Sequence, residues 1–174
     1  MDLKKIFLTS DTFFGRDSTA KERGYPSSNE MDNDLIKKWN DRVSKNDTVY
    51  HLGNFAWDPI SAASTLSQLN GNIIFLLANY DKAIEELVND YTFKITDKQI
   101  VEIFNFNAVL CHYPLEEWNG KENGTIHLHG HSKKVPTDIS KMNRINVCCD
   151  CWGLSPISLS FIHEIIQDFK NLSK

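Results

Sequence analysis

The chain has 174 residues, of which 41% are hydrophobic and 24% are charged, as in an ordinary soluble globular domain. The net charge of −4 and the pI near 5.8 argue against the large basic surface of a protein that binds extended nucleic acid. No apolar run is long enough to span a bilayer, and residues 1–10 lack the long apolar core of a signal peptide. We therefore expect one domain over residues 1–174, located in the cytoplasm and without a membrane partner.

The first half of the chain alternates between apolar runs and amphipathic segments, which is typical of strands that alternate with helices. Ser27 to Glu30 form a capping box before a helix, and Asp58-Pro59 starts another helix. Residues 12–26 are rich in glycine, serine and basic side chains and predict a loop. The expected elements are strand 3–9, helix 29–44, strand 48–52, a helix from Asp58 with Ile60, Ala63, Leu66 and Leu69 inside, strand 73–77 and helix 81–90.

Strands dominate the second half. The two short runs Lys94–Thr96 and Gln99–Phe104 flank Asp97-Lys98 and predict a hairpin. Further strands are expected at 107–111, 125–129 and 144–149, with a loop at 114–124 and a last helix at about 160–171. Trp39, Trp57 and Trp152 are assigned to the core. The pattern as a whole favours an α/β fold with two sheets.

The cysteines do not predict a metal site. Cys148 and Cys151 form one Cys-x-x-Cys pair, whereas a zinc site needs a second pair and a thioredoxin-like site needs the pair at the start of a helix. Here the pair follows a predicted strand, so reduced, buried cysteines are expected.

Polar side chains with metal-ligand chemistry follow the predicted strands. Ligands bind at the carboxyl ends of strands in open α/β sheets, so these residues are candidates for a common site. The segments, in chain order, are Ser10-Asp11-Thr12, Leu52-Gly53-Asn54, Ala78-Asn79-Tyr80-Asp81, Cys111-His112 and His129-Gly130-His131-Ser132-Lys133.

This ordered series resembles the calcineurin-like metallophosphoesterases, particularly their small single-domain bacterial and phage members. Those proteins carry Asp-x-His, Gly-Asp, Gly-Asn-His-Asp, a lone His and Gly-His-x-His in this order. The resemblance covers most of the chain and implies a two-sheet αββα sandwich. It also implies a centre in which two metal ions clamp a phosphate and activate a water.

Several positions depart from the family pattern. Those that keep the family residue are Asp11, Asn79, His112 and His131. Those that differ are Phe13 and Lys133 in place of histidine ligands, Arg16 in place of a further histidine, Asn54 in place of the bridging aspartate, and Tyr80 in place of the histidine that acts as general acid. A phenol with a reference pKa near 10 is a weak acid for that task, so Tyr80 is only a weak catalytic candidate.

The substitutions predict that the two-metal centre is lost. The first ion keeps only Asp11 as a good ligand, while Asn79, His112 and His131 hold at most one weakly bound Mn, Ni or Zn ion. Lys133 and Arg16 instead bring positive charge to the pocket. We expect Lys133 to pair with Asp11, and Arg16 to face a phosphate, which suits its planar fork.

We therefore expect a pseudoenzyme that binds or sequesters a phosphorylated ligand, above all a nucleotide or cyclic nucleotide signal, without hydrolysing it. Trp118 and Tyr113 either stack on a base or pack within their loop. Two alternatives stay open: an active metal-dependent phosphoesterase with one ion, and a structural interaction module. A homo-oligomer is compatible with each. The expected ligand-binding residues are Asp11, Arg16, Asn54, Asn79, Tyr80, His112, Trp118, His131 and Lys133.

Overall fold

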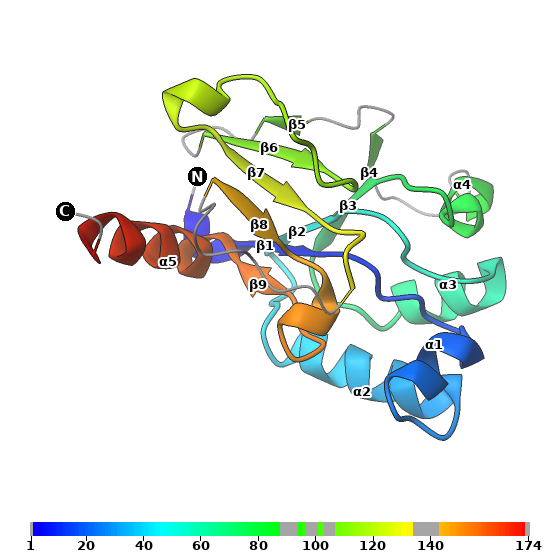
Figure 1. Cartoon of the computed structure of the whole chain (residues 1–174). Helices are drawn as coiled ribbons and strands as arrows, with labels where there is room; N and C mark the ends of the chain where they lie inside the picture. The colour runs from blue at the N-terminus through cyan, green and yellow to red at the C-terminus, as the bar shows by residue number, and fades with distance from the viewer. Residues whose placement is uncertain (1, 88–93, 97–100, 103–106, 134–142, 173–174) are drawn as a thin grey trace.

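The computed structural model describes residues 2–87, 94–96, 101–102, 107–133 and 143–172, and the structural statements below concern these residues. The fold is mixed α/β, with two sheets and several helices (Figure 1). One sheet has five strands in the order β4-β3-β2-β1-β9, and the other has four in the order β5-β6-β7-β8. Within the described residues, no helix is both long and apolar enough to cross a membrane.

The two sheets are largely parallel in the strands that carry the candidate residues. In the five-stranded sheet β1 to β4 are parallel and β9 is antiparallel to β1; in the other, β6, β7 and β8 are parallel and β5 is antiparallel. The strands of the first sheet are β1 Ile6–Thr9, β2 Thr48–His51, β3 Asn72–Leu76, β4 Lys94–Thr96 and β9 Ile157–Ser158. Those of the second are β5 Val101–Glu102, β6 Ala108–Cys111, β7 Ile126–His129 and β8 Arg144–Asn146.

The helices begin where local signals place them. Ser27 caps α2 by accepting from the Glu30 N–H, and Asp58 caps α3 by accepting from the Ser61 N–H, with Pro59 as the first helical residue. The helices are α1 Asp17–Glu22, α2 Ser28–Asn40, α3 Pro59–Leu66, α4 Lys82–Leu87 and α5 Leu159–Leu172, and the short 3₁₀ turns are η1 Leu3–Lys5, η2 Lys121–Asn123 and η4 Cys149–Cys151.

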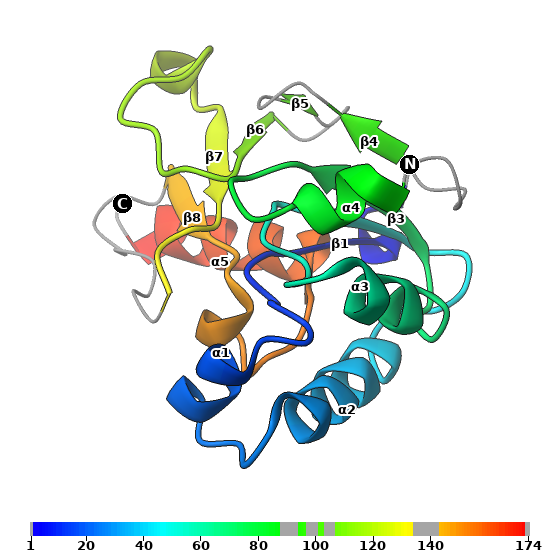
Figure 2. The same cartoon turned by 90° about the vertical axis from the view of Figure 1, so that its right-hand side faces the viewer.

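Side-chain alternation along β1 separates two cores. Leu8 points into a cluster shared by both sheets and α5, while Phe7 points into a cluster that joins the five-stranded sheet to α1–α4. Helices α1–α4 consequently lie together on one side of this sheet, as Figures 1 and 2 show. With this layering, the loops that follow β1, β2, β6 and β7 form one common group.

Several expected elements are corrected by the structure. The strand expected at 3–9 begins only at Ile6, because Asp2 caps the turn η1. The loop expected at 12–26 contains the helix α1. The hairpin is wrong: β4 pairs with β3 and β5 pairs with β6, so the two strands belong to different sheets. Ile60 and Trp57, both expected inside, are 82% and 51% exposed.

Candidate functional site

The predicted site residues follow the carboxyl ends of their strands. Asp11 follows β1 and Asn54 follows β2, while His112 and His131 follow β6 and β7 of the other sheet. The backbone pairs the loops: the Asp11 N–H donates to the Gly53 carbonyl at 2.9 Å, and the His131 N–H donates to Asp11 Oδ2 at 2.9 Å. The fold therefore brings residues from both sheets to one place.

The centre of this place is a chain of hydrogen bonds through Asn54. Its Nδ2 donates to Asp11 Oδ1 at 2.8 Å and lies 3.3 Å from His112 Nε2. His112 Nδ1 bonds the Leu52 carbonyl, which can only accept, so Nδ1 carries the proton and Nε2 is the acceptor. One amide group thus donates to both the carboxylate and the imidazole.

Asp11 is already well supplied with donors. Besides Asn54, the Ser10 hydroxyl donates to Oδ2 at 2.6 Å, and so does the His131 N–H. Asn54 is 5% exposed, and its Oδ1 is buried with no hydrogen-bond partner among the described residues. Since a buried acceptor without a partner is costly, this oxygen is a candidate contact for a donor or a cation.

Asp81 holds the loops after β2 and β3 together, a role that the sequence did not single out. Its carboxylate accepts from the N–H groups of Asn54 at 2.8 Å, Phe55 at 2.8 Å and Ala78 at 2.7 Å. Asp81 is 1% exposed, and burial raises the pKa of this carboxyl above its usual value although the three N–H groups act against that shift. The only sequence signal was its place as the last residue of the Asn79-Tyr80-Asp81 segment.

The backbone is strained at the same residues. Positive φ angles occur at Asp11 (59°), Phe13 (51°), Asn54 (61°) and His131 (66°). A left-handed conformation costs an L-residue roughly 1–2 kcal/mol, least for aspartate and asparagine. Such strain concentrates at functional sites, and here it affects Asp11, Asn54 and His131 of the predicted ligand-binding residues as well as Phe13; Leu154 (63°) also has a positive φ but is not a predicted site residue.

Two glycines allow the loops to approach each other. A Cβ on Gly130 would lie 2.3 Å from Ser10 Oγ and 2.9 Å from Asp11 Oδ2. A Cβ on Gly53 would lie 2.4 Å from the Ala78 Cβ and 3.0 Å from His112 Nδ1. Any side chain at either position would displace a member of the site.

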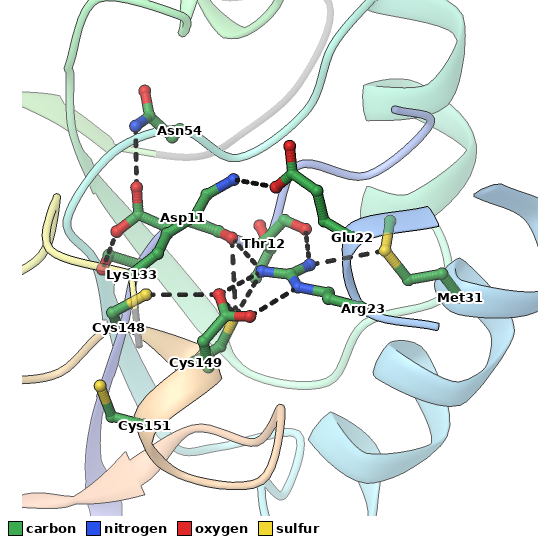
Figure 3. Close-up of polar contacts among 12 residues, drawn as sticks. Asp11, Thr12, Glu22, Arg23, Met31, Asn54, Lys133, Cys148, Cys149 and Cys151 are labelled. Atoms are coloured by element: carbon green, nitrogen blue, oxygen red, sulfur yellow. Dashed lines mark hydrogen bonds and ion pairs between the residues drawn. The ribbon is translucent and has the colours of Figure 1, made fainter. Parts of the chain in front are cut away.

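Two cations lie over Phe13. The Arg16 guanidinium carbon is 4.9 Å and the Lys133 ammonium 4.3 Å from the centre of this ring. Lys133 was expected to pair with Asp11, but its ion pair is with Glu22 at 3.5 Å (Figure 3), so that expectation is wrong. Among the described residues, no acceptor receives a hydrogen bond from the Arg16 guanidinium.

Arg16 also contacts two exposed aromatic side chains. Its guanidinium carbon lies 4.6 Å from the Trp57 ring and 5.4 Å from the Tyr80 ring. Trp57 and Tyr80 are 51% and 49% exposed, and their rings are 6.1 Å apart with an angle of 33°. Tyr80, the candidate catalytic residue, therefore lies at the edge of the site beside Phe13, 6.0 Å between ring centres.

A buried ion pair holds the backbone of the site at Asp11 and Thr12. Arg23 pairs with Asp150 at 2.7 Å, with side-chain exposures of 3% and 5%. The same guanidinium donates to the Asp11 carbonyl at 2.6 Å and the Thr12 carbonyl at 2.8 Å, and it contacts Cys149 and Met31, as Figure 3 shows. Nothing in the sequence pairs Arg23 with a residue 127 positions away, so sequence reasoning missed it.

Among the described residues, the side chains of the remaining predicted residues do not take part in the Asp11–Asn54–His112 hydrogen bonds. Asn79 is exposed and has no side-chain hydrogen bond among the described residues. Trp118 packs 5.2 Å from the His127 ring, with the Lys121 ammonium over its own ring, and its Nε1 donates to the Thr125 carbonyl. His131 is exposed, with its ring 5.2 Å from that of His112.

The other buried histidines are structural. His51 is fully buried and bonds the Thr12 hydroxyl at 2.9 Å, and burial lowers the pKa of this imidazole to about 3. Burial likewise lowers the pKa of His129 to about 4, so both rings are neutral at pH 7 and bring no charge to the site. The cysteines are all free thiols, as expected; Cys148 and Cys149 are buried and Cys151 is half-buried.

Comparison with known proteins finds relatives over the whole chain. No family model matches. The chain is 31% identical over 180 residues to the uncharacterized protein MJ1445 of Methanocaldococcus jannaschii, covering 98% of this chain and 96% of that protein. It is 23% identical over 203 residues to the gene 66 protein of Mycobacterium phage D29, covering 97% and 98%.

Solved structures show similar folds. A protein of unknown function from Aquifex aeolicus, AQ665, superposes with a TM-score of 0.71 and 23% identity, covering 92% of this chain and 98% of that one. The nuclease MPE of Pseudomonas putida superposes with a TM-score of 0.50 and 15% identity, covering 74% of this chain and 61% of the nuclease. At these identities the likeness concerns the fold alone.

Proposed function

The chain belongs to the same family as the uncharacterized protein MJ1445 of Methanocaldococcus jannaschii, and from its own site we propose that it binds a phosphorylated ligand without hydrolysing it. We place this site on a fold of the calcineurin-like metallophosphoesterase type. Two sheets that share a core and the chain order of the loops that carry Asp11, Asn54, His112 and His131 support that assignment.

The observation that carries the proposal is the pair of cations over Phe13. The faces of the Arg16 guanidinium lie against aromatic rings, while its N–H edges have no acceptor among the described residues. A guanidinium held in this way is prepared for two oxygens of a phosphate. Lys133 adds a second positive charge over the same ring, and its partner Glu22 is 59% exposed, so solvent weakens that pair.

The side chains present do not fit a two-metal centre. Phe13 cannot coordinate an ion, and the ammonium of Lys133 over its ring would repel one. Asn54 is neutral, whereas two dications share a negative oxygen, and its amide nitrogen already links Asp11 to His112. The resemblance implied two ions, and the chemistry of these donors argues against them.

The same contacts argue against metal-free hydrolysis. A water needs a general base within hydrogen-bond reach to become a nucleophile. Asp11 already accepts three hydrogen bonds, and the Nε2 of His112 faces the Asn54 amide, so both candidate bases are engaged within the protein. A bound phosphate ester would therefore persist intact.

One observation favours a second candidate, an active phosphoesterase with a single ion. Asn54 Oδ1 is buried without a partner among the described residues, and Asp11 Oδ1 and His112 Nε2 converge on the amide beside it. Rotation of this amide would direct its oxygen to the point that Asp11 Oδ1 and His112 Nε2, both acceptors, face. These three groups, with His131 at the rim, would hold the ion, and it would supply Lewis acidity toward a phosphoryl oxygen.

The test separates the candidates in one experiment. The full-length protein is incubated with a panel of linear and cyclic nucleotides, with and without Mn²⁺, and the filtrate is analysed by chromatography before and after heat denaturation. A compound that disappears and returns intact supports binding without hydrolysis. A compound that returns as a smaller product, with turnover lost in His112→Ala, supports the single-ion enzyme. Retention of no phosphorylated compound overturns the proposal and leaves the interaction module.

A further inference from the structure

We propose that Trp57 and Tyr80 form a platform on which the base of a nucleotide stacks, so that the phosphorylated ligand of this site is a nucleotide. This inference rests on the proposed function and names its ligand class. The sequence placed Trp57 in the core and considered Trp118 and Tyr113 for stacking. The structure instead leaves Trp57 at the surface beside Arg16.

The platform is exposed although its residues are aromatic. Trp57 is 51% and Tyr80 49% exposed, and they are adjacent, with ring centres 6.1 Å apart. The backbone fixes the position of Trp57, because its N–H donates to the Phe14 carbonyl at 2.9 Å. Stacking on aromatic rings is the general way in which proteins hold unpaired bases, and each base contributes about 1–3 kcal/mol.

Phe13 links the platform to the polar centre. Its ring touches Tyr80 edge-on, its N–H donates to the Asn54 carbonyl at 3.0 Å, and both cations lie over it. Arg16 therefore contacts both platform rings and Phe13, and the backbone of Phe13 bonds to Asn54 of the Asp11–Asn54–His112 network. A molecule with a flat apolar part and an anionic part matches this order.

Arg16 distinguishes this patch from other exposed apolar side chains. Phe161 is 47% exposed, but among the described residues no cation lies over its ring. The simplest competing interpretation is that the three rings only hold Arg16 in place. That interpretation predicts phosphate binding that does not depend on a base, so it is open to measurement.

The experiment uses isothermal titration of the full-length protein with two probes, adenosine 5′-monophosphate and ribose 5-phosphate. They share the phosphate and the sugar, so the ratio of their affinities reports the base alone. We expect adenosine 5′-monophosphate to bind at least about fivefold more tightly, from the energy of one stacked base. Trp57→Ala should remove this preference for adenosine 5′-monophosphate, so that the two affinities become equal, and Trp57→Phe should keep most of the preference.

The controls keep the two proposals separate. Phe161→Ala removes an aromatic side chain of similar exposure on α5, and it should leave both affinities unchanged. Tyr80→Ala provides a second platform variant should Trp57→Ala fail to fold by circular dichroism. Equal affinities for the two probes, or a Trp57→Ala variant that retains the ratio, would overturn the platform and leave the proposed function standing. Binding of neither probe, together with retention of no compound from the nucleotide panel, would overturn both proposals.

Discussion

Replacing Asn54 with aspartate would show whether the amide stabilises the site in the absence of a metal. The Asn54 Nδ2 is 2.8 Å from Asp11 Oδ1, so the substitution places a second carboxylate at hydrogen-bond distance from the first. Two charges at about this separation repel by about 6 kcal/mol at an effective dielectric constant of about 20. Binding of one shared proton limits the loss to roughly 4 kcal/mol at pH 7, the energy of moving an aspartate pKa from about 4 to about 7.

The pH dependence gives the sign of this effect. The shared proton has a raised pKa in the folded protein, so the folded variant is favoured at low pH and loses stability as the pH rises. We expect Asn54→Asp to lose about 3–4 kcal/mol of unfolding free energy at pH 7 in EDTA, and less at pH 5. The measurement is urea unfolding followed by circular dichroism. Mn²⁺ should restore part of the loss, about 2.7 kcal/mol at a concentration of about 100 times its Kd.

A matched control is available one loop away. Asn79→Asp makes the same chemical change at an exposed side chain, where we expect less than about 0.5 kcal/mol and no response to Mn²⁺. If Asn54→Asp were as stable as the parent protein in EDTA at pH 7, then the amide would not be holding Asp11 and His112 together. The interpretation of the site would then be wrong.

Further substitutions test the surroundings of the site. Gly130→Ala should weaken the binding of adenosine 5′-monophosphate at least about tenfold in titration calorimetry, because its Cβ would reach Asp11, whereas Gly124→Ala meets open space and should not. Burial raises the pKa of Asp32 to about 6, so the contribution of this carboxyl to stability is present below about pH 4 and lost as the pH rises through 6. In urea unfolding, the free energy of unfolding of Asp32→Asn should therefore rise by about 1 kcal/mol relative to that of the parent protein as the pH goes from 4 to 7.5. A difference that stays constant over this range would contradict the prediction. Arg23→Met should lower the free energy of unfolding by about 3–5 kcal/mol in the same assay, because it leaves the buried carboxylate of Asp150 unpaired. Arg144→Met, whose partner Glu116 is 84% exposed, should lower it by less than about 1 kcal/mol. Similar losses in the two variants would refute the distinction between a buried and an exposed ion pair.

Local signals in the sequence predicted the helix starts, most of the strands and the polar residues at the strand ends. The caps at Ser27 and Asp58 and the apolar strands gave most element positions, and the polar residues at strand ends located Asp11, Asn54, His112 and His131. Within each sheet, two of these residues come together because parallel strands end at the same edge, and the core that the two sheets share brings the two pairs to one place. Such a prediction needs no knowledge of side-chain contacts.

Features that depend on distant contacts could not be predicted in this way. The chain between β4 and β5 looked like a hairpin because short strands of three and two residues do not specify their partners. Trp57 precedes a helix, and its large apolar side chain is of the kind found in protein cores. Only the packed structure shows that it is exposed. The partner of Lys133 likewise depends on where α1 places Glu22.

The three hydrogen bonds that Asp81 accepts have a consequence for how such a protein changes in evolution. The donors are the main-chain N–H groups of Asn54, Phe55 and Ala78, so these hydrogen bonds do not depend on which side chains the three positions carry. Exchange of a ligand or an acid in these loops changes the reactivity of the pocket while its shape is retained. Side chains at Asn54, Phe55 and Ala78 can in this way be exchanged while the backbone of the two loops keeps its bonds to Asp81.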